Sequence, residues 1–155
     1  MSASITLRTF IAASPETVFD LELDVAAHKE SLSFSCETVI GSHSQHLKMG
    51  DLITWRARHL LVHWTMTVRI CDYDRPRSFV DEQVSGPFSH FRHVHRFDAH
   101  GEGGTEMTDE ILFRLPFGFL GWFAERIVLA RYLARIIAVR NEYLKREAER
   151  NRTDR

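Results

Sequence analysis

The sequence contains few cysteines: Cys36 and Cys71 are the only two in 155 residues. Two thiols are too few for the disulfide framework of a small secreted domain, and they do not form the paired Cys-x-x-Cys pattern of a zinc site. We therefore expect both cysteines to be reduced thiols buried in the core.

Long apolar segments are also missing. The longest apolar runs, such as Ile-Val-Leu-Ala at 127–130, fall far below the roughly 20 residues that span a bilayer. The first ten residues, MSASITLRTF, contain no apolar run that resembles a signal peptide. These absences predict a cytoplasmic protein without stable membrane insertion.

Neither sign of charge dominates the sequence, and several catalytic motifs are absent. The formal net charge is −1, whereas nucleic-acid binding usually demands a strongly basic face, so we expect no nucleic-acid partner. The sequence has no glycine-rich phosphate loop, no nucleophile elbow and no His-Glu-x-x-His motif. The His-x-His spacing at 93–95 is a weak metal signal by itself, and we expect neither a metal ion nor a cofactor.

The strongest signal in the sequence is the periodicity of its apolar residues. Alternation of apolar and polar residues with period two predicts seven strands. Ser14-Pro15-Glu16 predicts the start of one short helix, and Asp24 predicts the cap of a second. Apolar residues at helical spacing near the C-terminus predict one long amphipathic helix. The expected strands cover 4–12, 34–41, 52–58, 61–73, 78–84, 90–98 and 105–115, and the long helix covers 120–150.

The order of these elements predicts the fold class. Successive strands joined by short turns form an antiparallel meander, and its apolar face must be covered. The long C-terminal helix is the only element large enough to cover it. We therefore predict a single α+β domain over residues 1–155, with an ordered core at about 4–148. Its architecture is a helix-grip fold: a curved seven-stranded antiparallel sheet around the C-terminal helix, with two short helices between the first two strands.

One segment is more informative than the rest: FSHFRHVHRF at 88–97. On a strand, Phe91, His93, His95 and Phe97 share one face. That face is apolar at both ends and polar in the middle, which is typical of a cavity wall that orients a bound molecule.

The segments FVDEQVSGPFSHFRHVHRF and GGTEMTDEILFRLPFG resemble a small bacterial branch of the START-related SRPBCC superfamily, which includes polyketide cyclases and the birch-pollen allergen type. The resemblance covers about residues 4–148, and Phe91 stands where that branch usually has Trp. It implies a helix-grip fold with an internal cavity, and it implies no particular activity, because one fold hosts many functions. The matching residues are Asp81, Glu82, Gln83, Gly86, Pro87, Phe88, His93, His95, Phe97, Thr105, Asp109, Pro116 and Gly118.

Strand alternation assembles a candidate binding site on the inner face of the sheet. Two imidazoles, two carboxylates and one amide lie there among apolar residues, so we expect the carboxylates to pair with the histidines or to be protonated. The expected ligand-binding residues are Trp64, Met66, Asp81, Gln83, Phe91, His93, His95, Phe97, Met107, Asp109, Ile111 and Phe113.

Three interpretations of the polar residues stay open. They can form a structural network, they can orient a ligand, or they can catalyse proton transfer, with His93, His95 and Asp109 as the catalytic candidates. We interpret the chain as a protein that binds a small apolar or amphipathic molecule between sheet and helix. The alternatives are a metal-independent cyclase or dehydratase acting on a polyketide-like or aromatic substrate, and a protein-interaction module with a vestigial cavity. The residues leave the ligand and the oligomeric state open.

Other charged groups are expected to be solvated. We expect the arginines at 131, 135 and 140 of the long helix to be exposed to solvent. The same prediction applies to the histidines at positions 43, 46, 59, 63, 90 and 100.

Overall fold

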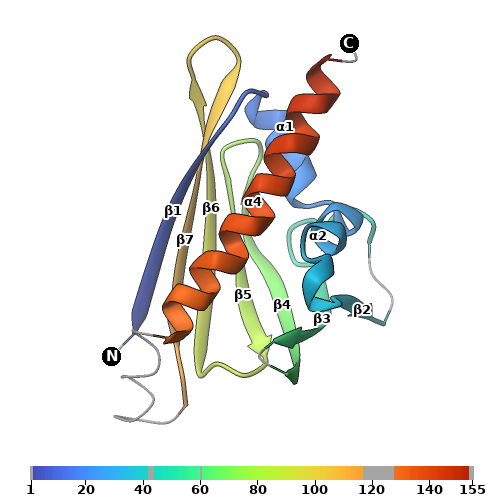
Figure 1. Ribbon diagram of the computed structural model, residues 1–155, viewed down its shortest axis with the longest axis vertical. Coiled ribbons are helices and arrows are strands. Elements are labelled where there is room, and N and C mark those ends of the chain that lie inside the picture. The colour runs from blue at the N-terminus through green and yellow to red at the C-terminus, as the bar shows by residue number, and fades with distance from the viewer. Residues whose placement is uncertain (1, 42–43, 60, 117–127, 154–155) are drawn as a thin grey trace.

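A computed structural model of the chain describes residues 2–41, 44–59, 61–116 and 128–153. Figure 1 shows a curved sheet with one long helix lying across it and two short helices beside that helix. The strands are β1 (Ala3–Ile11), β2 (Thr38–Ile40), β3 (Leu52–His59), β4 (Val62–Asp74), β5 (Ser78–Ser85), β6 (His90–His100) and β7 (Gly104–Arg114). The helices are α1 (Pro15–Glu22), α2 (Val25–Ser31), a 3-10 turn η1 (Ser33–Ser35) and α4 (Ala130–Thr153).

The seven strands form one antiparallel sheet in the order β1-β7-β6-β5-β4-β3-β2. Strands β2 to β7 pair with their sequence neighbours. Strand β1 pairs with β7 and forms one edge of the sheet. The register of β6 and β7 places His95 opposite Asp109 and Phe97 opposite Met107, so these side chains share one face. The predicted helix-grip architecture is confirmed.

The two short helices begin where their caps predict. The Ser14 side chain accepts a hydrogen bond from the Thr17 amide, and Pro15 follows in the first turn of α1. The Asp24 carboxylate accepts from the Ala27 amide at the start of α2. Each cap satisfies a backbone N–H that has no partner inside its helix.

Helix α4 covers the inner face of the sheet. It packs beside β1, α1 and α2, and its residues Ile136, Leu144 and Ala148 are buried. Ala148 belongs to the same apolar core as Phe19 of α1. Of the predicted range 120–150, residues 120–127 lie outside the described residues.

Two local predictions are wrong. The expected strand at 34–41 is reduced to Thr38–Ile40, because Ser33–Ser35 form a 3-10 turn and Cys36 adopts a left-handed backbone with φ of 52°. The thiol of Cys36 is therefore exposed rather than buried, whereas Cys71 is half-buried.

No helix in the described part of the chain is both long and apolar enough to cross a membrane.

Candidate functional site

A cavity of about 230 Å³ lies between the sheet and α4. Its wall is mainly apolar: the sheet contributes Trp55, Val68 and Ile70, and α4 contributes Leu133 and Ile136. Alternate residues of each strand face inward and the apolar stripe of α4 faces back toward them. The cavity therefore follows from the curvature of the sheet around one helix.

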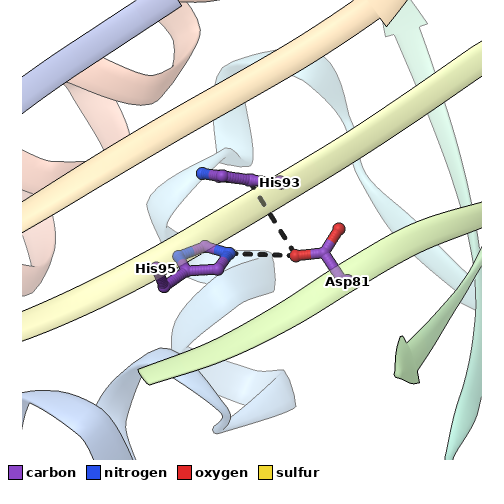
Figure 2. A group of neighbouring side chains, drawn as sticks. All are labelled: Asp81, His93 and His95. Atoms are coloured by element: carbon purple, nitrogen blue, oxygen red, sulfur yellow. Dashed lines mark hydrogen bonds and ion pairs between the residues drawn. The ribbon is translucent and has the colours of Figure 1, made fainter. Parts of the chain in front are cut away.

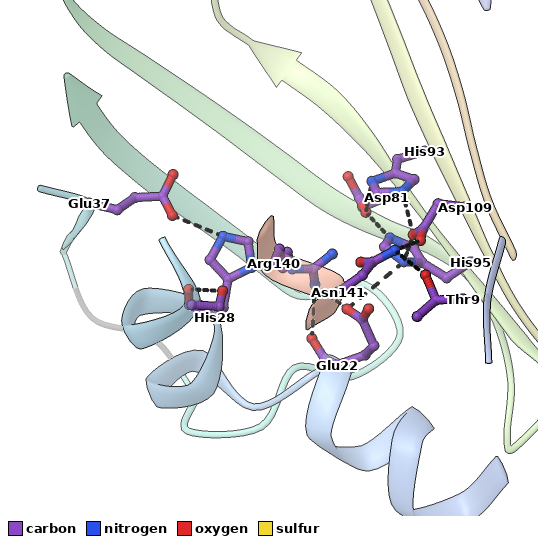
Figure 3. A network of polar contacts seen from close by, with 11 residues as sticks. Thr9, Glu22, His28, Glu37, Asp81, His93, His95, Asp109, Arg140 and Asn141 are labelled. Atoms are coloured by element: carbon purple, nitrogen blue, oxygen red, sulfur yellow. Dashed lines mark hydrogen bonds and ion pairs between the residues drawn. The ribbon is translucent and has the colours of Figure 1, made fainter. Parts of the chain in front are cut away.

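A polar cluster occupies one region of this wall. Glu22, Asp81, His93, His95 and Arg140 all line the cavity, and they come from α1, β5, β6 and α4. Figure 3 shows these side chains together with Asp109 and Asn141, which lie beside them. Side chains from two helices and two adjacent strands thus converge on one charged cluster in a mainly apolar cavity.

Two histidines and two aspartates form the centre of the cluster. Nε2 of His93 lies 2.9 Å from Oδ1 of Asp109, and Nε2 of His95 lies 2.9 Å from Oδ2 of Asp81. Nδ1 of His95 lies 3.2 Å from Oδ1 of Asp109, an ion-pair distance without hydrogen-bond alignment. The two imidazole rings lie 3.7 Å apart at an angle of 33°. The expected pairing of carboxylates with imidazoles is therefore present.

The environment keeps both aspartates ionised. Burial opposes ionisation of Asp81, but the hydrogen bond from His95 and the proximity of the two imidazoles outweigh it and lower the pKa of Asp81. Burial also opposes ionisation of Asp109, yet the hydrogen bond from His93 and the close contact with His95 hold its pKa well below the usual range. Asp109 is wholly inaccessible to solvent, so its charge depends on these donors.

The two imidazoles differ in protonation. Burial and the neighbouring charge of His95 lower the pKa of His93, despite its bond to Asp109. Burial opposes protonation of His95 as well, but Asp109 and Asp81 raise the pKa of His95 to about 9. Near neutral pH, His95 is therefore the protonated, positively charged imidazolium and His93 is neutral. Since Asp109 is ionised, the neutral His93 donates from Nε2 and keeps Nδ1 as an acceptor.

An arginine and an asparagine of α4 complete the cluster. Nη2 of Arg140 donates to Oε2 of Glu22, and both side chains are buried. Nδ2 of Asn141 donates to Oδ2 of Asp109 at 2.6 Å and to Oγ1 of Thr9 at 3.1 Å. The expectation that Arg140 is solvated is wrong, because α4 turns this guanidinium toward α1. The arginines at 131 and 135 are exposed, as predicted.

A second polar group lies elsewhere on the cavity wall. The ring of His28 stacks on Trp55 with 4.1 Å between centroids, and its Nε2 lies 3.1 Å from Oε2 of Glu37. Nδ1 of His59 lies 3.0 Å from the Tyr132 hydroxyl. Burial lowers the pKa of His59, so the prediction of a solvated imidazole is wrong at this position.

The predicted ligand-binding residues separate into two sets. Trp64, Met66, Asp81, Phe91, His93 and His95 line the cavity. The others lie beside it: Gln83 bonds the backbone of Phe88, Asp109 lies behind the histidines, and Phe97, Met107, Ile111 and Phe113 belong to the packed core. A role in ligand binding stays a prediction for every one of them.

The sequence-based prediction of the site did not include Glu22, Arg140 or Asn141, although the sequence carries a signal for them. Glu22 follows Phe19 by three residues and Val18 by four, so helical spacing places it on their buried face. Arg140 and Asn141 interrupt the apolar stripe of the C-terminal helix between positions 137 and 144. A charged residue inside such a stripe indicates a buried partner.

The arrangement allows three kinds of chemistry. The apolar wall can exclude water from a bound molecule, and the polar cluster can donate or accept hydrogen bonds at one end of it. His93, held by an ionised aspartate, can also exchange a proton with a bound molecule. Asp81, His93 and His95 have ligand atoms within 4.8 Å of one another, as do Glu22, His95 and Asp109, so nitrogen and oxygen donors for a metal ion are also present.

Comparison with known proteins agrees with this architecture. The sequence profile of the family described as "Polyketide cyclase / dehydrase and lipid transport" matches residues 2–149. No curated protein matches the sequence.

Solved structures share the fold at low sequence identity. The Zhui aromatase/cyclase from Streptomyces sp. R1128 has a TM-score of 0.78 and 16% identity, covering 97% of this chain and 95% of its own. The protein TTHA0849 from Thermus thermophilus has a TM-score of 0.71 and 16% identity, covering 92% and 97%. The major latex-like protein 151 from Panax ginseng has a TM-score of 0.67 and 14% identity, covering 95% and 97%. The chain belongs to the polyketide cyclase/dehydrase and lipid transport family.

Proposed function

We propose that the chain binds one small apolar or amphipathic molecule in the cavity between the sheet and α4. The observation that carries this proposal is the cavity itself: about 230 Å³ of space with a largely apolar wall and one polar cluster. A dry apolar cavity of about 150 Å³ binds benzene. A molecule of roughly one to two rings is therefore the expected size of ligand.

The wall chemistry specifies the polarity of the ligand. Side chains such as Trp55, Val68 and Ile136 bury an apolar body and stabilise it by about 25 cal/mol for each Å² removed from water. The polar end of the molecule lies against Asp81 and His93. Polyketides and lipids, named in the family description, combine an apolar body with oxygen-bearing groups in this way.

Filling the cavity tests this proposal. Ala57 of β3 is buried and lines the cavity, so Ala57→Phe places a ring in the space that a ligand occupies. We expect 2-naphthol to bind the wild-type chain at one site and to change the emission of Trp55 and Trp64, which also line the cavity. Ala57→Phe should weaken this binding at least tenfold, or about 1.4 kcal/mol.

The matched control is Ala99→Phe, which adds the same ring at an exposed position of β6. Thermal unfolding of each variant shows whether it remains folded. Equal affinity of the wild-type chain and a folded Ala57→Phe variant would place the probe outside the cavity and refute the proposal.

Acid–base catalysis is a second candidate function. The observation that favours it is the 2.9 Å contact between His93 and the buried, ionised Asp109, since this pairing orients an imidazole for proton transfer. The discriminating measurement is mass spectrometry of the bound molecule after long incubation. An unchanged mass supports binding alone, and a mass lower by one water supports a dehydratase or a cyclisation that releases water.

A further inference from the structure

Three side chains on the cavity wall direct nitrogen and oxygen atoms at a common point. Figure 2 shows Asp81 of β5 facing His93 and His95 of β6. Oδ2 of Asp81 lies 2.9 Å from Nε2 of His95 and 3.9 Å from Nδ1 of His93, and the three ligand atoms all lie within 4.8 Å of one another. Ligands bonded at about 2.1 Å to one ion lie about 3.0–3.4 Å apart, so shifts of around 1 Å would bring them into coordination.

The opposite nitrogens of both imidazoles face a single carboxylate. Oδ1 of Asp109 lies 2.9 Å from Nε2 of His93 and 3.2 Å from Nδ1 of His95. A metal-binding histidine almost always directs its other ring nitrogen at a carboxylate or carbonyl, which fixes the ring and increases its basicity. Asn141 holds the second oxygen of Asp109 at 2.6 Å. This outer support is a hydrogen bond for His93 and a 3.2 Å contact for His95.

The charge of the cluster favours a dication. Glu22, Asp81 and Asp109 carry three carboxylates around a single guanidinium, that of Arg140. With one proton on His95, one formal negative charge stays uncompensated in the buried cluster, which is unfavourable. Protonation of His93 as well would compensate it, but two cations 3.7 Å apart repel each other. One divalent ion in place of the His95 proton compensates this charge without that repulsion.

We propose that Asp81, His93 and His95 form a mononuclear site for a divalent first-row transition-metal ion at the cavity wall. Two imidazoles and one carboxylate suit zinc, iron, cobalt or manganese, and they leave open coordination positions. These positions face the cavity, because all three side chains line it. The second triplet, Glu22, His95 and Asp109, is fully buried, and Glu22 is already paired with Arg140.

Occupation of this site changes the chemistry open to a cavity ligand. A carbonyl, enolate or phenolate oxygen would complete the coordination sphere, and the metal would polarise it as a Lewis acid. Nδ1 of His93 would then be a metal ligand rather than a proton acceptor. The metal proposal goes beyond binding of an apolar molecule and does not depend on it.

Zinc and cobalt binding to the full chain tests the proposal. Protein stripped with a chelator and dialysed is titrated with Zn²⁺ by calorimetry, and Co²⁺ is followed by its visible d–d absorption. We expect one ion per chain. Asp81→Asn and His93→Gln should each weaken Zn²⁺ binding more than 100-fold, and Asp109→Asn should weaken it 10–100-fold as an outer support. His63→Gln, at an exposed position of β4, should leave the affinity unchanged.

Two outcomes would overturn the metal site. One is the absence of saturable one-to-one binding to the wild-type chain. The other is Zn²⁺ binding that survives in folded Asp81→Asn and His93→Gln, because it would then belong to surface histidines. The naphthol titration is run with a chelator present, so that failure of the metal site and failure of the apolar cavity are separate results.

Discussion

Replacing Asp109 with alanine should destabilise the chain by about 3–5 kcal/mol, the range for removing one partner of a buried charged group. Asp109 is wholly buried and lies within 3.2 Å of donor atoms on His93, His95 and Asn141. Alanine leaves these donors without their acceptor and leaves the charge of His95 with less compensation. Urea unfolding, followed by circular dichroism, measures the difference in free energy of unfolding.

The matched control for this prediction is Asp98→Ala. Asp98 belongs to the neighbouring strand β6 and is exposed, so its loss should change the free energy of unfolding by no more than about 0.5 kcal/mol. A loss below about 1 kcal/mol for Asp109→Ala would show that the cluster does not hold strand β7 to β6 and α4. In that case the interpretation of the histidines as part of a structural network is wrong.

Arg140→Met should have a comparable effect, because it removes the partner of Glu22. Both side chains are buried, and Arg140 connects α4 to α1. Methionine at position 140 therefore leaves the buried Glu22 carboxylate without its guanidinium partner. We expect a loss of about 3–5 kcal/mol. Adding Glu22→Met should recover part of this loss, since an apolar pair of similar volume removes the uncompensated charge.

A double-mutant cycle measures this coupling. The comparison variant is Arg135→Met, which changes an exposed arginine of the same helix and should alter stability by no more than about 0.5 kcal/mol. If the losses of Arg140→Met and Glu22→Met add without coupling, the ion pair does not fasten α4 over the cavity.

The fold was predictable because its signals are local and repeated. Period-two alternation identified the long strands, with ends correct to within two residues for β3 to β7, and the caps at Ser14 and Asp24 identified the short helices. The segment at 33–37 was misread, because a 3-10 turn followed by a left-handed Cys36 has no periodicity of its own. Alternation over two or three residues does not distinguish strand from turn.

The site was predictable on the sheet and poorly predictable on the helices. Strand parity identifies the face of Asp81, His93, His95 and Asp109 without knowledge of the register. The contributions of Glu22 and Arg140 depend on how α4 crosses the sheet beside α1, which is a tertiary property. Their positions in buried helical stripes were the only local indication, and polar residues at such positions are more often solvated than paired.

The proposed function requires a small apolar molecule to bind inside the cavity between the sheet and α4. The most direct measurement is NMR of the chain with bound 2-naphthol, using nuclear Overhauser effects between the ligand and protein side chains. We predict contacts to the ring of Trp55 and to the methyl groups of Val68 and Ile136, which line the cavity. Contacts confined to exposed apolar side chains such as Leu61 and Val62 would contradict the claim.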